Sequence, residues 1–322
     1  MQNQVEIIEV GPRKGLQYHQ QYIDVKYKIS LIQKLFEAGF KRMEVTSLVH
    51  PKEMPQMKDG LDVLQNIKIG PDQIKQVLVP NEIGCRNAIA YGAQELVVWV
   101  YITDELNRLS LKCDRSATLK EINSIIQIAD ANGIKVTAWI AGAFGYPGMN
   151  FPFVEEVRAL AAKLILLGCV DVCLGDEFCM ANPFLVKKYL NVYFKEIDQS
   201  KLLLHFNENR GLGLANYIAA YEEGIRKFKT CISGIGGQMY LGARKEDGVS
   251  HTIFPTIATE DLVYVFEEMG ISTGLDLDKL IESGRYAETF FKKKLHSLVI
   301  ANHLYEADSE ARPLSNLKFY RV

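Results

Sequence analysis

Eight short runs rich in apolar and β-branched residues alternate along this chain with segments of helical periodicity, and this alternation restricts the fold more than any other feature. The runs are Val5–Val10, Arg42–Ser47, Gln76–Asn81, Glu95–Ile102, Lys135–Ala143, Asp171–Asp176, Leu202–Asn207 and Phe228–Gly234. Several are continuously apolar, as parallel strands covered on both faces are. One helical segment opens at Asp24 and stops at Gly39, and another opens at Ser116 and stops at Gly133. Eight such β-then-α units predict an α/β fold, a (β/α)8 barrel, to which a doubly wound sheet is the alternative.

The length of the chain fits one barrel and a short C-terminal addition. A barrel of this kind takes about 250 residues, and the chain has 322. We expect the barrel, with the catalytic site, over residues 1–274, and its last helix over 260–269. No low-complexity linker follows, so residues 275–322 are expected to form C-terminal helices and a tail packed on the barrel.

Charge and hydropathy argue against several classes of function. The chain has 37 Lys and Arg against 39 Asp and Glu, a formal net charge of −2, so nucleic acid is not an expected partner. No apolar run approaches the ~18 residues of a membrane span, and the first residues lack the basic and apolar segments of a signal peptide. With six scattered cysteines, these features predict a cytoplasmic protein that does not bind membranes.

Polar and ionisable residues gather where the expected strands end, the place where such barrels carry their chemistry. They are Arg13 and Lys14 after the first run, Glu44 and Thr46 on the second, Asp176 at the end of the sixth, and His205, Asn207 and Glu208 at the end of the seventh. His205 and Asn207 are two residues apart, so both point to one face of the strand. Any one of these residues has a structural interpretation, such as an ion pair between Glu44 and Arg13. Their convergence from several strands favours an active site.

The same regions carry motifs of a known family. The motifs are Glu9–Gln17, Glu44–Ser47, Leu174–Asp176, Gly234–Gly237 and Ala258–Tyr264. From about residue 5 to about residue 290 the chain resembles 3-hydroxy-3-methylglutaryl-CoA (HMG-CoA) lyase and its relatives. The resemblance implies a TIM barrel, a homodimer, and an enzyme that makes or breaks a carbon–carbon bond beside a carbonyl. In the family a divalent metal polarises that carbonyl.

The chain departs from the family at the positions that hold the metal. These positions correspond to Lys14, His205, Asn207 and Thr256, so one of the four family ligands is retained. A Lys ammonium has no lone pair and repels a divalent cation. We therefore expect no metal and no other cofactor.

Three further departures lie around the eighth strand. The catalytic Cys of the family corresponds to Gln238, and the loop that follows is longer and carries Arg244. Lys229 stands where the family has an Asp, and we expect it to face solvent or a helix.

These observations assign a role to each residue of the expected catalytic set. Arg13 binds a carboxylate or enolate oxygen, Glu44 or Asp176 is the base, and His205 donates a proton. Lys14 replaces the metal's positive charge, either as an imine-forming amine or as a free ammonium that stabilises an enolate. An ion pair that only supports the barrel is the third interpretation of Lys14. Arg13 beside it would lower its pKa, whereas Glu44 or Asp176 would keep it charged.

The expected reaction is aldol-type cleavage or formation of a carbon–carbon bond in a small anionic keto acid or acyl thioester. The residues expected to bind this substrate are Gln17, Thr46, Asn207, Glu208, Gln238 and Arg244. Two alternatives remain open. One is a non-catalytic relative that binds a metabolite or a protein. The other is a metal-dependent acyl-CoA lyase with a rebuilt ligand set such as Asp176, His205 and Glu208.

Overall fold

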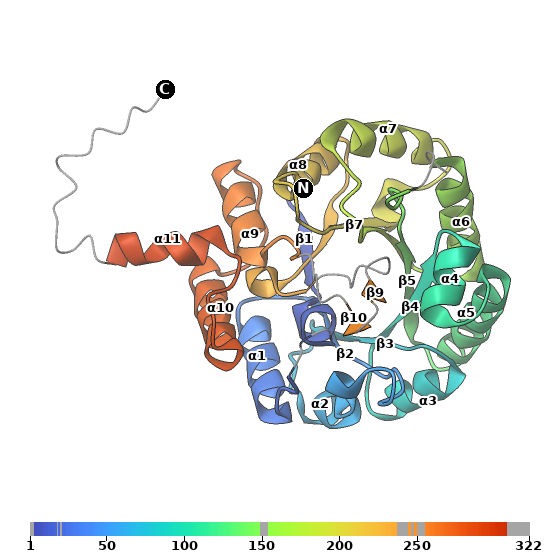
Figure 1. Ribbon diagram of the computed structural model, residues 1–322, viewed down its shortest axis with the longest axis horizontal. Coiled ribbons are helices and arrows are strands. Elements are labelled where there is room, and N and C mark those ends of the chain that lie inside the picture. The colour runs from blue at the N-terminus through green and yellow to red at the C-terminus, as the bar shows by residue number, and fades with distance from the viewer. Residues whose placement is uncertain are drawn as a thin grey trace.

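The computed structural model describes residues 3–17, 19, 21–148, 154–236, 244–245, 248–249 and 255–307, with backbone alone at 244–245, 248–249 and 303–307. Eight parallel strands close into one barrel in chain order, each paired with the next and β8 with β1 (Figure 1). They are β1 (Glu6–Glu9), β2 (Arg42–Ser47), β3 (Ile74–Leu78), β4 (Glu95–Tyr101), β5 (Lys135–Ala141), β6 (Asp171–Asp176), β7 (Leu202–Phe206) and β8 (Lys227–Thr230). The predicted (β/α)8 TIM barrel is confirmed.

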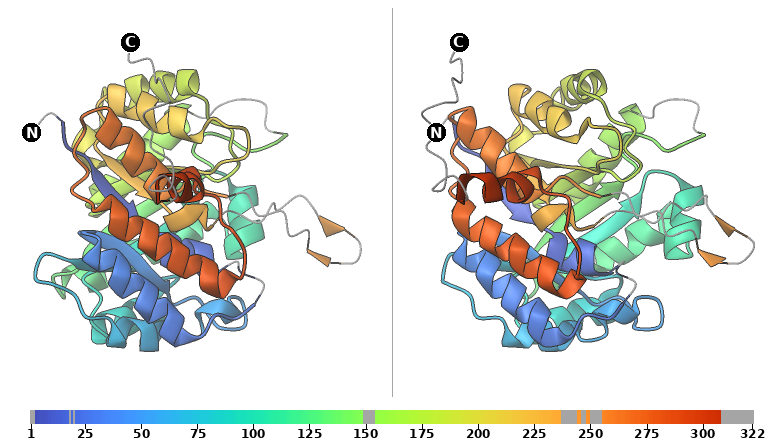
Figure 2. Two further views of the ribbon diagram at one scale, coloured as in Figure 1. Left: turned by 90° about the vertical axis from the view of Figure 1, so that its left-hand side faces the viewer. Right: turned by 60° about the vertical axis from the view of Figure 1, so that its left-hand side comes forward.

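Helices surround the barrel on its outside (Figures 1 and 2). They are α1 (Val25–Glu37), α2 (Gly60–Asn66), α3 (Glu82–Ala90), α4 (Asp104–Leu111), α5 (Arg115–Asp130), α6 (Val154–Leu167), α7 (Pro183–Tyr193), α8 (Gly213–Glu222) and α9 (Thr259–Glu268). The Asp24 carboxylate accepts the Lys26 N–H and caps α1, as predicted. The expected start of α5 at Ser116 is wrong, because Asp114 is the N-cap and accepts the Ala117 N–H.

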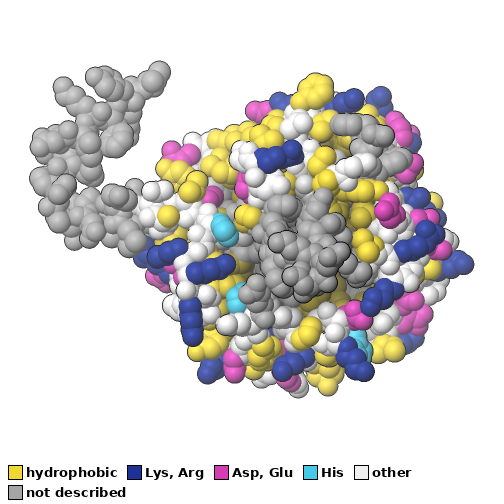
Figure 3. Space-filling model, viewed as in Figure 1, with side chains coloured by type: hydrophobic (Ala, Val, Ile, Leu, Met, Phe, Trp, Pro, Cys, Tyr) yellow, Lys and Arg dark blue, Asp and Glu magenta, His cyan; other side chains and the backbone are white. Residues whose placement is uncertain are grey.

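Two more helices, α10 (Leu277–Phe291) and α11 (Leu298–Ala307), follow the barrel, and α10 packs against α1 and α9. Gly284 of α10 lies against the barrel so closely that a Cβ there would be 2.5 Å from Oε1 of Glu260. No helix in the described part of the chain is long and apolar enough to cross a membrane. On the face shown in Figure 3, side chains of both charge signs are interspersed.

Charged residues fill the amino end of the barrel. Arg42, Glu95 and Asp171 are the first residues of β2, β4 and β6, so alternate strands place them in one layer. Nη2 of Arg42 donates to Glu95 Oε1 and to Asp171 Oδ2, both at 2.8 Å. Lys227, the first residue of β8, donates to the other oxygen of Asp171 at 2.7 Å. Paired ions therefore occupy this end, and the uncommitted polar groups lie at the carboxyl end.

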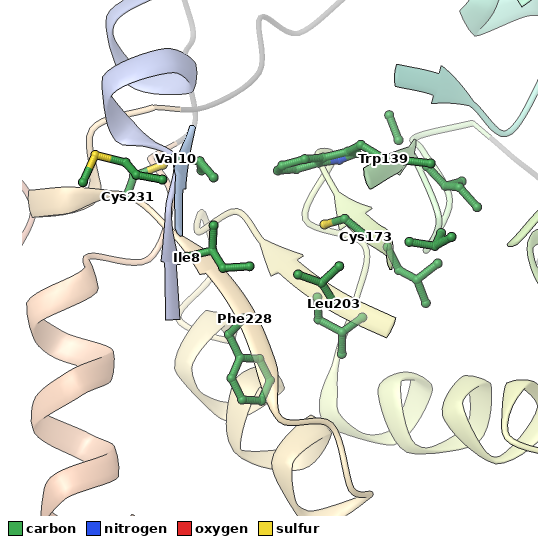
Figure 4. Packing of buried hydrophobic residues seen from close by; sticks show 14 of the residues in the cluster. Ile8, Val10, Trp139, Cys173, Leu203, Phe228 and Cys231 are labelled. Carbon is green, nitrogen blue, oxygen red and sulfur yellow. The ribbon is translucent and has the colours of Figure 1, made fainter. Parts of the chain in front are cut away.

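Above this layer the barrel interior contains apolar side chains. Figure 4 shows Leu203 and Cys173 inside the sheet and the indole of Trp139 pointing from β5 toward Val10. Trp139 is fully buried, and it pairs in register with Trp99 of β4. Residues of β4 alternate between the two faces of the sheet, so Glu95, Val97 and Trp99 share the face inside the barrel. This places two large aromatic rings just beneath the carboxyl end.

Candidate active site

A short helical turn over Gly11–Gly15, directly after β1, carries Arg13 and Lys14. Oε1 of Glu9, the last residue of β1, accepts the N–H groups of Gly11 at 2.7 Å and Ile232 at 2.8 Å. A Cβ on Gly11 would lie 2.6 Å from that oxygen, so the turn can approach the carboxylate only because this residue is glycine. Glu9 thereby fixes the turn to the end of β8 and holds both basic residues in the barrel.

Glu44 of β2 binds two cations. Nε of Arg13 donates to Glu44 Oε2 at 2.6 Å, and Nζ of Lys229 donates to Glu44 Oε1 at 2.5 Å. Burial raises the pKa of Glu44, but the charges of Arg13 and Lys229 outweigh that effect and hold the pKa below its usual value. Glu44 therefore stays ionised and organises the two cations. The expectation that Lys229 faces solvent or a helix is wrong, because its side chain is buried inside the barrel against this carboxylate.

The two tryptophans form an aromatic wall beside these cations. The rings of Trp99 and Trp139 are stacked with centroids 4.7 Å apart. Lys14 Nζ lies 4.9 Å and Lys229 Nζ 4.8 Å from the Trp139 ring centre, and the Arg13 guanidinium carbon lies 5.4 Å from it. At these distances the ring faces attract the cations. Sequence reasoning missed both residues; the available signal was a tryptophan at the same level near the ends of two neighbouring strands.

Lys14 is almost completely buried, and its Nζ lies 4.0 Å from Glu177 Oε1. Within the described residues, Nζ has no hydrogen-bond acceptor. Burial lowers the pKa of Lys14, while the negative charge of Glu177 opposes that shift. A lysine with a lowered pKa exposes the neutral amine, which is the nucleophilic form.

Glu177 directly follows β6, and the catalytic set expected from the sequence did not include it. Its Oε1 accepts the indole N–H of Trp139 at 2.6 Å, and its Oε2 accepts the backbone N–H of Gly142 at 2.7 Å. These two bonds fix the carboxylate near Lys14. A carboxylate from β6 therefore faces the ammonium that follows β1.

His205 of β7 lies against the same indole, with ring centroids 4.9 Å apart. Its Nδ1 is 2.9 Å from the Lys229 carbonyl oxygen, and its Nε2 is 3.1 Å from Asn207 Oδ1. Burial and the charge of Lys14 lower the pKa of His205 well below its usual value, so the ring is neutral. The Lys229 carbonyl and Asn207 Oδ1 both only accept hydrogen bonds, so the neutral ring donates to one of them, and its other nitrogen carries a lone pair that can take up a proton.

Asp176 and Glu208 bind the backbone of their own loops. Asp176 accepts the N–H groups of Met180 and Ala181, and burial raises its pKa to about 7. Glu208 accepts N–H groups of Arg210, Gly211 and Gly213, which fixes the loop after β7. Both residues line one small hollow with Asn207 and Cys179.

The remaining expected substrate-binding residues are placed as follows. Gln17 is buried after the Gly11–Gly15 turn, and Thr46 Oγ1 lies 4.0 Å from Met57 Sδ. Gln238 lies outside the described residues. Arg244 is described by backbone alone, in the two-stranded hairpin β9 (Arg244–Lys245) and β10 (Gly248–Val249). The structure thus brings together Arg13, Lys14, Glu44 and His205, and places Asp176 and Glu208 in the adjoining hollow.

Comparison with known proteins identifies the family of this chain. The HMGL-like family model matches residues 4–286. The chain belongs to the HMGL-like family. Mitochondrial hydroxymethylglutaryl-CoA lyase of Mus musculus is 34% identical over 92% of the chain and 88% of its own length, and that of Homo sapiens is 32% identical over the same shares. The HMG-CoA lyase structure from Bacillus subtilis superposes with a TM-score of 0.87 at 30% identity, covering 94% of this chain and 98% of that one.

A second HMG-CoA lyase structure, from Acinetobacter baumannii in complex with coenzyme A and 3-methylmalate, has a TM-score of 0.86 at 30% identity and covers 100% and 99% of the two chains. The expectation of a carbon–carbon lyase in the HMG-CoA lyase superfamily is therefore confirmed. Relatives include mitochondrial and cytoplasmic lyases, so the cytoplasmic location stays a prediction, as do the homodimer and the small anionic substrate.

The expectation of no cofactor is overturned by this membership, because HMG-CoA lyases of the family depend on a divalent metal. The residues at the family's metal position do not fit such an ion as they are arranged here. A buried ammonium, Lys14, stands there, and Thr256 offers a hydroxyl that donates to the Ile235 carbonyl at 3.4 Å. His205 is the one imidazole, and the described residues contain no group of three or more His, Cys, Asp and Glu side chains placed to hold a metal.

Proposed function

We propose that this protein cleaves or forms a carbon–carbon bond beside the ketone of a small keto acid, and that the Lys14 amine forms an imine with that ketone. The observation that carries the proposal is the state of Lys14: it is buried, lacks a hydrogen-bond acceptor in the described part of the chain, and has a lowered pKa. Membership in a family of carbon–carbon lyases supports the reaction class.

In the cleavage direction the neutral amine of Lys14 adds to the keto carbon, and water leaves to give a protonated imine. With the ring proton on Nδ1, Nε2 of His205 then accepts the proton of a hydroxyl on the second carbon beyond the imine carbon. The bond between the first and second carbons breaks, the hydroxyl carbon becomes a carbonyl, and the electron pair of the broken bond forms the carbon–carbon double bond of an enamine as the imine nitrogen becomes neutral. Protonation of the enamine carbon and hydrolysis of the imine return Lys14. Condensation is the reverse sequence.

The surrounding residues support these steps. Glu44 binds Arg13 and Lys229 by ion pairs, and after burial the nearby charge of Arg13 also lowers the pKa of Lys14. Glu177 places a negative charge near Nζ, which stabilises the protonated imine as it forms. The aromatic wall of Trp99 and Trp139 excludes water from one side of the amine.

Borohydride trapping tests the imine. Incubating the protein with pyruvate and sodium borohydride should add one reduced pyruvate per chain, which peptide mass spectrometry should locate on Lys14. Lys14→Arg keeps the charge but has no nucleophilic amine, so the adduct should disappear. Lys28→Arg is the matched control, because Lys28 is also buried but is bonded to Asp59 on the outer side of the barrel; it should label like wild type.

Turnover of 4-hydroxy-2-oxo acids, in which the hydroxyl is on the second carbon beyond the ketone, gives the second measurement. Lys14→Ala should lower the rate by about 10²-fold or more, the scale of one preorganised charge-stabilising group. No adduct on Lys14, together with normal turnover in Lys14→Ala, would refute the proposal and favour a binding protein.

A further inference from the structure

The indole N–H of Trp99 is a second buried donor without an acceptor beside Lys14. Within the described residues, Nε1 of Trp99 and Nζ of Lys14 both lack a hydrogen-bond partner. The neighbouring tryptophan is the internal comparison, because Trp139 donates its N–H to Glu177. A buried donor without an acceptor is destabilising, so the two free donors indicate that a ligand supplies the acceptor.

Charge identifies the kind of acceptor. Arg13, Lys14 and Lys229 face the tryptophan wall, and Glu44 and Glu177 are the carboxylates paired with them. The basic side chains outnumber the carboxylates by one, so an anionic acceptor is favoured over a neutral one at this place. The two groups are also neighbours, because Lys14 Nζ lies over the Trp99 ring, 5.9 Å from its centre.

We propose that Trp99 is a specificity-determining residue, whose indole N–H binds the carboxylate of a 2-oxo acid while the adjacent keto group faces Lys14. Trp99 then selects a keto acid over a neutral ketone of the same shape. The proposal rests on the proposed function for the position of the keto group, but carboxylate binding itself needs no chemical step.

Fluorescence offers a direct assay, because Trp99 and Trp139 are the only two tryptophans of the chain. Wild type and Trp99→Phe are titrated with pyruvate and with methyl pyruvate, its uncharged ester, and the tryptophan emission is followed, which in the variant comes from Trp139 alone. Trp99→Phe keeps an aromatic ring and loses the N–H. It should weaken pyruvate binding about tenfold, the value of one charge-assisted hydrogen bond, and leave methyl pyruvate binding within about twofold.

Trp99→His is the rescue variant, because its smaller ring retains an N–H donor. It should bind pyruvate more tightly than Trp99→Phe does. Equal weakening of pyruvate and methyl pyruvate in Trp99→Phe shows that Trp99 acts only through its shape and overturns the proposal, as does wild-type protein that does not prefer pyruvate.

The two proposals fail in different ways. If the preference for pyruvate depends on Trp99 but no borohydride adduct forms, the carboxylate site is supported and the imine is refuted. If the adduct on Lys14 forms with the same dependence on pyruvate concentration in wild type and in Trp99→Phe, the imine is supported and the role of Trp99 is refuted.

Discussion

Replacing Glu9 by glutamine should stabilise the folded protein above neutral pH far more than at pH 5. Glu9 is completely buried at the end of β1, and burial raises its pKa from 4.5 to about 7 despite the hydrogen bonds it accepts. Glutamine has nearly the same shape. Its Oε1 can keep the bonds from Gly11 and Ile232, and its Nε2 can donate to Thr259 Oγ1. The Thr259 hydroxyl can then turn to Thr230 Oγ1, 2.7 Å away.

The sign follows from proton linkage. Because the pKa is higher in the folded state, the folded protein retains this proton where the unfolded chain has lost it. The stability that the protonated Glu9 contributes is complete below pH 4.5 and is lost as the pH rises to about 7. A shift of this size corresponds to about 3 kcal/mol, since each pKa unit is worth about 1.4 kcal/mol. Glutamine does not ionise, so the variant avoids the loss.

The assay is urea unfolding followed by tryptophan fluorescence at pH 5 and pH 8. The advantage of Glu9→Gln over wild type should grow by about 2–3 kcal/mol between these two values. Glu37→Gln, which changes an exposed carboxylate at the end of α1, is the matched control and should show no such growth. An advantage that is the same at both pH values, or a variant less stable than wild type at pH 8, would refute the reasoning.

Three other changes test the site and its surroundings. Glu177→Gln removes the charge that raises the Lys14 pKa, so the acidic limb of the kcat/KM profile should move to lower pH; an unmoved limb contradicts the pairing. Arg42→Met leaves buried carboxylates unpaired at the amino end and should lower the unfolding free energy by about 3–5 kcal/mol, with kcat within about twofold; a large loss of kcat would show that the two ends are coupled. The triple variant Lys14→Asp/Asn207→His/Thr256→Asn rebuilds the family's ligand set and should bind one Mn²⁺ per chain more than wild type in calorimetric titration, whereas Lys14→Asp alone should not. Equal Mn²⁺ binding by the triple variant and wild type counts against the assignment of these positions.

Local sequence signals were sufficient for the fold. Continuous apolar runs predict β4 to β7. The ends of α1 are predictable because the Asp24 cap and the positive φ of Gly39 each depend only on residues next to them in the chain. β3 lies two residues earlier than its apolar run suggests, at Ile74–Leu78. The residues of β3 that pair are set by its register with β4, in which Gln76 lies opposite Glu95. Registers depend on the partner strand, which a single run does not specify.

The site was predictable only where residues follow directly from strand ends. The orientation of Lys229 depends on Glu44, a partner 185 positions away in the chain. The sequence pattern predicts that a lysine in such a strand is exposed to solvent, unless the buried carboxylate that binds it is known. The tryptophan wall likewise requires the in-register pairing of Trp99 and Trp139. Both features arise from contacts between strands, and the sequence of either strand alone carries no signal for them.

The charged layer at the amino end also constrains the order in which the chain can assemble. Arg42 emerges with β2, but its partner Asp171 arrives only with β6, and the lysine that completes the group, Lys227, arrives with β8. An N-terminal fragment that stops before β6 retains the pair of Arg42 and Glu95 but lacks the strands that cover this pair in the closed barrel. The charged layer is complete only when β8 brings Lys227 to Asp171.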